Sequence, residues 1–381
     1  MTDWYNSSWP YRKKITLHGE NISGNHTNFP FLFKINEPDS DLASHGLSDG
    51  TDFIFTTDDG TTRVHHEIEN WLNGSGCIWV RAPTLTDETD ADFYLYYGEG
   101  TDHTSDTGYL PSGVWDNNYI MVQHMYDYPS NSYISGSTTR HLLGTKGGAG
   151  EPTEITGIIH KGQDFDGNDY IDCTQDSSLN LDSSITLECW VKIVDKGQVD
   201  TANYQYFLSR RAATWQKGYE FYSIDSNYAR FLINDGTSRY ITDDVSIADN
   251  IWHQIIGIRD VPNDKLRLYI DGNIAVNPVT DESTGSIAAT TSFVIGQSLS
   301  DIGNRNVKGL IDEIRVSDMV RNWGWIKTSY SSQSSPSTFF DLLTEEPYPI
   351  AEENELYVTN VHNQYGRLIF TGNNNQTIRI L

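Results

Sequence analysis

The chain has 381 residues, of which 37% are hydrophobic, and it carries 26 basic against 52 acidic residues, a formal net charge of −26. This length predicts two or three domains. The negative charge disfavours binding to nucleic acid, whose phosphates it would repel, and no apolar stretch is long enough to predict a membrane insertion. Two explanations of the acidity stay open: a highly soluble extracellular-type protein, or a halophilic protein adapted to high salt.

The first 106 residues predict a series of short β-strands. Apolar and polar residues alternate in segments such as 29–35 and 53–55, and turn residues such as Asp58-Asp59-Gly60 lie between the segments. Strands at short, regular spacing are typical of a β-sandwich, because each strand buries one face and exposes the other. We therefore predict an N-terminal β-sandwich domain over residues 1–106.

Two carboxylates of this module resemble a catalytic pair. Glu67 and Glu69 lie two residues apart on a predicted strand, so their side chains share one face at a separation of about 7 Å. That separation is near the one used by glycosidases. The third carboxylate of the Glu-x-Asp-x-x-Glu strand of laminarinase-type hydrolases is missing, because Asn70 and Trp71 follow. We therefore favour a solvated edge strand, and we predict no catalytic residue in the chain.

Several separated motifs characterise the first module. They are Trp9-Pro10-Tyr11-Arg12-Lys13, Ser48-Asp49-Gly50-Thr51-Asp52, Asp59-Gly60-Thr61, His66-Glu67-Ile68-Glu69, Ile78-Trp79-Val80 and Leu95-Tyr96-Tyr97-Gly98. Together they resemble a widespread microbial domain of unknown function that commonly precedes a laminin-G-like domain in prokaryotic surface proteins. This resemblance implies a fold and a neighbouring domain, and it implies no reaction.

A second, larger β-sandwich is predicted over residues 107–345. The segments Cys189-Trp190-Val191, Leu268-Tyr269-Ile270-Asp271-Gly272 and Asp312-Glu313-Ile314-Arg315 resemble the laminin-G-like, concanavalin A-like jelly roll. The resemblance implies an all-β fold whose relatives often bind sugars on a concave face or at loop tips. The residues 320–330 predict one short helix after the last strand, and we expect no other helix in the chain.

Asp166 and Asp312 bracket the second module. The resemblance implies that their strands are neighbours and that many relatives hold a structural calcium ion nearby. Both carboxylates are candidate calcium ligands, because calcium prefers hard oxygen donors. The alternative, which stays open, is that Asp166 and Asp169 cap the turn around Gly167, while Asp312 pairs with Arg315 or accepts backbone N–H bonds.

Aromatic residues in the middle of the second module are candidates for ligand binding, because aromatic faces stack on sugar rings. They are Trp215, Tyr219, Tyr222 and Tyr240. The alternative for each is an ordinary place in the sandwich core. Trp215 is the candidate that we would test first, since it lies in a polar loop.

The cysteines and the adjacent histidines do not predict a metal-binding site. Cys77, Cys173 and Cys189 form an odd set without a CxxC pair and lie in strand-like stretches, so we expect buried free thiols. The adjacent His65 and His66 point to opposite faces of a strand and cannot chelate one ion together.

Residues 346–381 form a β-rich appendix outside both modules. A segment this short cannot bury its own core. We expect it to dock on the sandwich or on other chains, which favours a homo-oligomer.

The modules resemble surface modules, yet no signal-peptide pattern follows Met1. This combination favours a virion protein, because such a protein is assembled in the cytoplasm and acts outside after lysis. We therefore predict a non-enzymatic virion component, such as a tail fibre, spike or capsid decoration, that recognises a host cell-surface glycan or glycoprotein. Its other partners would be virion proteins or its own copies. The alternatives are an extracellular surface adhesin or carbohydrate-binding protein, and a glycoside hydrolase of the concanavalin-like class.

Overall fold

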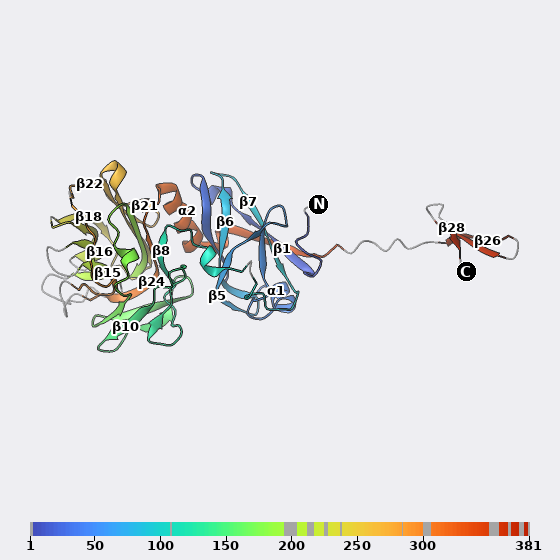
Figure 1. Ribbon diagram of the computed structural model, residues 1–381, viewed down its shortest axis with the longest axis horizontal. Helices are drawn as coiled ribbons and strands as arrows, with labels where there is room; N and C mark the ends of the chain where they lie inside the picture. Colours follow the sequence, from blue (N-terminus) through green and yellow to red (C-terminus); the bar gives the residue numbers. More distant parts are fainter. Residues whose placement is uncertain are drawn as a thin grey trace. The chain divides into compact units, whose positions relative to one another are not determined.

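The computed structural model describes residues 3–106, 109–193, 204–211, 217–224, 228–236, 238–283, 285–299 and 306–349, and strands at 358–364, 367–372 and 377–379. For residues 238–245 and for the last three strands only the backbone is described. The chain divides into a main unit, residues 1–346, and a C-terminal unit, residues 347–381. Strands dominate both units (Figure 1), so the predicted all-β fold is confirmed.

The first sandwich of the main unit packs a five-stranded sheet against a three-stranded one. The larger sheet has the order β25 (Phe340–Pro347), β1 (Tyr11–Leu17), β7 (Ala91–Tyr97), β3 (Ile54–Thr57) and β4 (Arg63–Val64). The smaller sheet has the order β2 (His26–Ile35), β6 (Ser75–Leu85) and β5 (His66–Leu72). Buried residues from both sheets, among them Phe31, Phe55 and Ile78, form one hydrophobic core.

Strand β25 shows that the chain returns to the first sandwich near the end of the main unit. The sequence prediction placed residues up to 345 in the second sandwich, whereas β25 lies beside β1. The side chains explain this position, because Phe340 is buried and its ring stacks on Phe33 of β2, with 5.2 Å between the ring centroids.

The second sandwich packs an eight-stranded sheet against a nine-stranded one. The first sheet has the order β18 (Ser238–Ser246), β17 (Tyr228–Asn234), β16 (Gly218–Ile224), β15 (Gln205–Arg211), β23 (Val294–Ile295), β13 (Asp169–Asp172), β10 (Gly144–Gly148) and β9 (Tyr133–Ile134). The second has the order β11 (Thr153–Thr156), β12 (Lys161–Asp166), β24 (Lys308–Ser317), β14 (Ile185–Lys192), β19 (His253–Asp260), β20 (Lys265–Ile270) and β21 (Asn273–Ile274), with β22 (Val279–Thr280) beside β20 and β8 (Tyr119–Gln123) beside β24. Residues such as Phe207 and Leu187 bring both sheets into one core.

Helix α2 (Trp323–Ser334) confirms the helix predicted after the last strand of the second sandwich. It contacts both sandwiches: the Ser332 hydroxyl accepts a hydrogen bond from the Leu32 amide of β2, and the Trp190 indole of β14 donates to Gln333. The prediction of a single helix is wrong. Two short helices, α1 (Ser40–His45) and α3 (Pro336–Phe339), are also present.

Helix α1 was missed because it is too short to show a helical period of apolar residues. Its start is fixed by Asp39, whose carboxylate accepts hydrogen bonds from the amides of Asp41 and Leu42. Short 3-10 helices lie at Gly19–Asn21, Pro111–Gly113, Ser177–Leu179 and Val261–Asn263. Among the described residues, no helix is both long and apolar enough to cross a membrane.

The three cysteines of the chain are buried free thiols, as predicted. Burial raises the thiol pKa of Cys77, Cys173 and Cys189. Because the thiolate is the reactive form, these side chains behave as small apolar residues.

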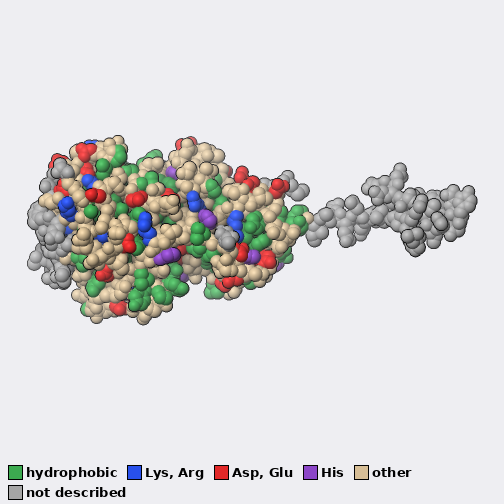
Figure 2. All heavy atoms as spheres, viewed as in Figure 1, with side chains coloured by type: hydrophobic (Ala, Val, Ile, Leu, Met, Phe, Trp, Pro, Cys, Tyr) green, Lys and Arg blue, Asp and Glu red, His purple; other side chains and the backbone are tan. Residues whose placement is uncertain are grey.

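The surface of the main unit carries the acidic residues in a dispersed pattern. Figure 2 shows Asp and Glu side chains spread over the visible face, with Lys and Arg side chains between them. The excess negative charge of the sequence is therefore distributed on this face and does not form one block.

The C-terminal unit is a three-stranded antiparallel sheet. Its strands are β26 (Val358–Gln364), β27 (Arg367–Gly372) and β28 (Thr377–Arg379), paired in chain order. The sequence predicted strands in this part of the chain.

Candidate functional site

The two sandwiches meet at a buried polar region, which we call the junction. Its side chains come from β5 and β6 of the first sandwich and from β24 and the residues around β8 of the second. The indoles of Trp79 and Trp115 enclose it, with 5.4 Å between their centroids. The guanidinium carbon of Arg315 lies 4.4 Å from the ring centroid of Trp79 and 5.0 Å from that of Trp115.

A β-bulge in β24 directs two neighbouring carboxylates into the junction. In the pairing of β24 with β14, Trp190 lies opposite Asp312, but Glu188 lies opposite Arg315, so the register shifts between them. Glu313 has a φ of +48°, in the left-handed region that non-glycine residues rarely adopt. Ile311 and Ile314 both reach the core of the second sandwich, so the two-residue alternation is broken between them.

Asp312 is held by the backbone of the segment before β12. One of its carboxylate oxygens accepts hydrogen bonds from the amides of Ile158 and Ile159, at 2.9 and 3.2 Å. The other accepts from the amide of Glu313, at 2.8 Å. Burial, followed by the charges of Glu313 and Glu69, raises the pKa of Asp312 well above its usual value.

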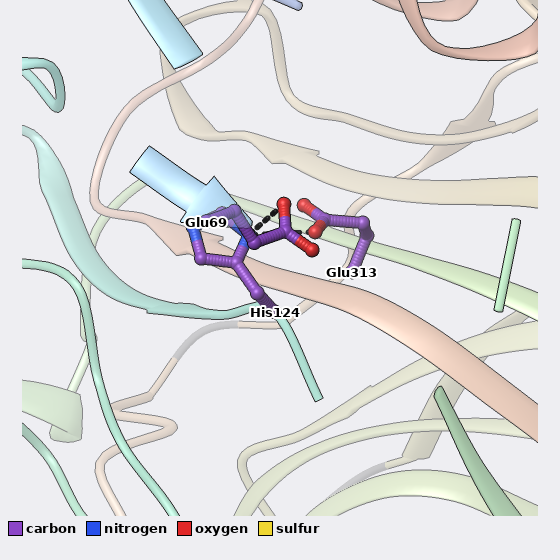
Figure 3. Close-up of side chains that lie close together, drawn as sticks. All are labelled: Glu69, His124 and Glu313. Atoms are coloured by element: carbon purple, nitrogen blue, oxygen red, sulfur yellow. Dashed lines mark hydrogen bonds and ion pairs between the residues drawn. The ribbon is translucent and has the colours of Figure 1, made fainter. Parts of the chain in front are cut away.

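Three side chains converge beside Asp312, and we call them the junction cluster: Glu69 of β5, His124 directly after β8, and Glu313 of β24 (Figure 3). The Nδ1 atom of His124 lies 2.6 Å from Oε1 of Glu313 and 3.6 Å from Oε2 of Glu69. The side chains of all three residues are 0% exposed. Nitrogen and carboxylate oxygen atoms of all three residues lie within 4.8 Å of one another.

Further polar groups support this cluster. The Trp79 indole donates a hydrogen bond to Oε2 of Glu69 at 2.9 Å, and Arg315 donates to Oε2 of Glu313 at 2.7 Å. The Trp115 indole donates to Oε2 of Glu67 at 2.6 Å, and this oxygen lies 3.5 Å from Nε2 of His124. The junction therefore holds more carboxylates than cationic groups.

The protonation of the cluster follows from burial and from the neighbouring charges. Burial raises the pKa of Glu69 to about 8. Burial alone would lower the pKa of His124, but the charges of Glu313 and Glu69 raise it well above its usual value. Burial alone would raise the pKa of Glu313, but the charges of His124 and Arg315 lower it. Glu313 therefore carries the negative charge of the cluster opposite a protonated His124.

The prediction that Glu67 and Glu69 lie on a solvated edge strand is wrong. Strand β5 is an edge of its sheet, but the second sandwich covers that edge, so Glu67 is only 9% exposed and the Glu69 side chain is buried. No local pattern in the sequence distinguishes such a covered edge from a solvated one.

The two predicted calcium ligands do not meet. Their strands β12 and β24 are neighbours, as the resemblance implied, but Asp166 lies opposite Lys308, four residues before Asp312. At about 3.3 Å per residue the two positions are roughly 13 Å apart, so one calcium ion cannot be bound by both. Asp166 is exposed and accepts a hydrogen bond from the Asn168 amide across the turn at Gly167.

The aromatic candidates are placed in different surroundings. Tyr219 is 1% exposed, belongs to the core and donates a hydrogen bond to the Leu179 carbonyl. Tyr222 is buried and stacks on Tyr206, with 5.1 Å between the ring centroids. Tyr240 lies on β18, where its backbone pairs with Leu232, and its side chain is outside the described residues. Trp215 also lies outside the described residues.

A cleft of about 550 Å³ opens beside the junction, and we call it the junction cleft. Its lining comes from both sandwiches and from the start of α2, and it is rich in amide, hydroxyl and imidazole groups. Representative lining residues are Asn28, His65, Arg81, Asn117, Thr139 and Arg321. This cleft could not be predicted from the sequence, because its walls come from segments that are far apart in the chain.

Arg321 fixes one wall of the cleft. It donates two hydrogen bonds, each of 2.8 Å, to the two carboxylate oxygens of Asp116. Its guanidinium carbon lies 4.2 Å from the ring centroid of Tyr119 and 4.3 Å from that of Trp325. A bidentate pair of this kind holds its side chains in one geometry, so this wall is preorganised.

The second sandwich matches a known family. Residues 165–327 match the model of the concanavalin A-like lectin/glucanases superfamily. This part of the chain is a concanavalin A-like domain. The finding confirms the predicted resemblance of the second module, while the resemblance of the first module to a microbial domain of unknown function stays a prediction.

Solved structures with a similar arrangement include toxin and glycosidase domains. The receptor-binding domain of botulinum neurotoxin D has a TM-score of 0.44 and 11% identity, over 57% of this chain and 53% of that one. The binding domain of botulinum neurotoxin serotype G has a TM-score of 0.45 and 16% identity, over 57% and 52%. Domain 4 of a GH43 extracellular arabinanase from Geobacillus stearothermophilus, in complex with arabinotriose, has a TM-score of 0.43 and 19% identity, over 56% and 99%.

The chain thus spans about half the length of the two neurotoxin domains. The comparison with curated proteins found no match.

Proposed function

We propose that this protein is a non-enzymatic, carbohydrate-binding adhesion protein and that the junction cleft is its glycan site. The match of residues 165–327 to the concanavalin A-like lectin/glucanases superfamily carries the choice of carbohydrate as the ligand class. The cleft supports the location, since it is a concave surface with many polar groups close together.

The chemistry of the cleft suits a saccharide. Amide and hydroxyl groups such as those of Asn117 and Thr139 both donate and accept hydrogen bonds, as sugar hydroxyls require. The described lining includes Arg81 and Arg321 but only one carboxylate, that of Asp116. An excess of arginine over carboxylate in the cleft contrasts with the net charge of −26 of the whole chain. This excess suits a neutral or acidic sugar.

The buried carboxylates support a binding role over hydrolysis. A glycosidase needs two carboxyl groups that reach the scissile bond. The side chains of Glu69 and Glu313 are 0% exposed, so a polysaccharide cannot reach them without separating the two sandwiches.

Replacing Asn117 by tryptophan is expected to weaken glycan binding at least tenfold, a loss of about 1.4 kcal/mol. Asn117 is exposed and lines the cleft, so the indole would fill space that a sugar needs and would remove one amide. A glycan array identifies the ligand, and titration calorimetry then compares the variant with the parent.

The matched control is Asn131→Trp, because Asn131 is also exposed but does not line the cleft. Equal binding by the parent and Asn117→Trp would remove the cleft from the proposal. A parent that binds no glycan would remove the carbohydrate role, and release of reducing sugar from a polysaccharide would show an enzyme.

For the biological setting we propose a virion, with a cellular surface adhesin as the alternative. The resemblance of both modules to surface modules supports a place of action outside a cell, which the two settings share. Mass spectrometry of purified particles, or capsid and tail genes beside the gene of this protein, would separate the two settings.

We also propose that the C-terminal unit mediates assembly of several copies. Its three short strands cannot bury a core of their own. Light scattering is expected to show an oligomer for the full chain and a monomer for a chain that ends at residue 346. A monomeric full chain would contradict this proposal.

A further inference from the structure

We propose that Glu69, His124 and Glu313 form a buried site for a divalent transition-metal ion that fastens the two sandwiches together. This site is separate from the glycan-binding cleft, and it does not depend on the proposed function. Each ligand comes from a different strand region, β5, the residue after β8, and β24, so one ion would bridge both sandwiches (Figure 3).

In the part of the chain that the structure describes, one carboxylate oxygen of the junction cluster is buried without a partner. Among the described residues, Oε1 of Glu69 is buried and has no hydrogen-bond partner, although its neighbour Oε2 accepts from the Trp79 indole. A buried carboxylate oxygen without a partner is costly. The Glu69 carboxylate points toward Glu313 and His124 (Figure 3), so a cation bound there would satisfy this oxygen.

The balance of charge around the junction cluster also favours a cation. The junction holds the carboxyl groups of Glu67, Glu69, Asp312 and Glu313 against two cationic groups, His124 and Arg315. Excess carboxylates in a buried place must either take up protons or bind a cation. Protons and a metal ion are therefore competing occupants of the same cluster, and an experiment can separate them.

The side chains of Glu313 and His124 are oriented as metal ligands would be. Glu313 reaches the cluster only through the bulge that gives it a φ of +48°, a backbone strain of the kind that collects at functional sites. With Nδ1 as the ligand atom, Nε2 of His124 faces the Glu67 carboxylate, at 3.5 Å. Metal-bound histidines usually direct their second nitrogen at such a carboxylate.

The donor set selects the class of metal. One imidazole nitrogen with two carboxylates suits zinc and similar ions, whereas calcium and magnesium prefer oxygen ligands alone. In a tetrahedral zinc site with bonds of about 2.0 Å, ligand atoms lie roughly 3.3 Å apart. The 3.6 Å from Nδ1 of His124 to Oε2 of Glu69 is close to this value and places the Glu69 carboxylate, which also carries the unpartnered Oε1, within reach of such an ion. The 2.6 Å from Nδ1 to Oε1 of Glu313 must open by less than 1 Å.

The test uses the full chain, freed of metal by a chelator and then titrated with zinc chloride. We expect one zinc ion per main unit by elemental analysis and a rise of several degrees in the unfolding temperature. Glu69→Gln should lower zinc affinity at least 100-fold, and Glu67→Gln should lower it roughly 10- to 100-fold, because Glu67 acts through His124.

Glu188→Gln is the matched control. It also removes a buried carboxylate near Arg315, but no proposed ligand, so its zinc affinity should equal that of the parent. If Glu69→Gln does not fold, X-ray absorption of the zinc-loaded parent still tests the site, since it should show a single imidazole among oxygen ligands.

Three results would overturn the proposal. They are an unchanged unfolding temperature in excess zinc, a Glu69→Gln variant that folds and binds zinc as tightly as the parent, and an absorption spectrum with several imidazoles. A rise in unfolding temperature with calcium chloride that is lost in Glu69→Gln would also contradict the choice of metal, because calcium would then occupy the junction cluster.

Discussion

Replacing Arg315 by methionine is expected to lower the free energy of unfolding by about 3–5 kcal/mol, the usual loss when one partner of a buried ion pair is removed. Arg315 is 1% exposed and donates a hydrogen bond to Glu313 at 2.7 Å. Its guanidinium also lies 3.6 Å from Glu188. Methionine would fill part of the space between Trp79 and Trp115, but it would leave both carboxylates without this cation.

Urea unfolding of the parent and the variant measures this loss. The control is Lys14→Met, because Lys14 pairs with Asp92 at 2.7 Å while their side chains are 29% and 34% exposed. A partly exposed pair contributes less than about 1 kcal/mol. Equal losses in the two variants would show that burial adds nothing to the Arg315 interactions.

Much of the fold is readable from the sequence, because β-strands leave a local signature. The alternation of apolar and polar residues predicted sandwiches, and the motifs around Trp190 and Leu268 pointed to the concanavalin A-like domain that residues 165–327 form. Helix α2 was also predictable. The return of β25 to the first sandwich was not, since its partner β1 is more than 300 residues earlier in the chain.

The junction cluster could not be predicted for two physical reasons. Its members, Glu69, His124 and Glu313, come from segments that only the docking of two sandwiches brings together. In addition, the bulge at Glu313 breaks the two-residue period on which every strand argument depends. The adjacent carboxylates Asp312 and Glu313 therefore indicated a real polar site. Asp166, which the sequence suggested as the partner of Asp312, lies elsewhere on β12.

Acidification is expected to destabilise the protein through His66, a buried histidine of β5. Its ring packs beside Phe55 and Tyr109, with centroid distances of 5.1 and 5.0 Å. Burial lowers the pKa of His66 to about 3, and the charges of Arg63 and His65 act in the same direction. An unfolded chain would protonate this ring near pH 6.5. The folded pKa is the lower one, so the stability contribution is complete above pH 6.5 and is lost as the pH falls toward 3.

The expected loss is about 1.4 kcal/mol for each pH unit below 6.5. His66→Phe removes this proton uptake while keeping an aromatic ring, so the parent should lose about 2–3 kcal/mol more than the variant between pH 6.5 and 4.5. Urea unfolding at several pH values measures the difference in unfolding free energy between the parent and His66→Phe. The other titrating groups are the same in both proteins, so their contributions cancel in this difference. Parallel pH profiles for the parent and His66→Phe would contradict the prediction.

His253 provides a control of opposite sign. Burial alone would lower its pKa, but hydrogen bonds to Asp271 and Asp249 raise it above the usual value. The folded pKa is then the higher one, so the contribution of His253 is complete below pH 6.5 and is lost as the pH rises through the folded pKa. As the pH falls through the folded pKa of His253 to 6.5, the gap between the parent and His253→Phe should therefore widen, whereas below pH 6.5 the gap between the parent and His66→Phe should shift in favour of the variant. A pair of buried histidines with opposite slopes cannot be explained by a general acid effect on the fold, because such an effect would move both variants in the same direction.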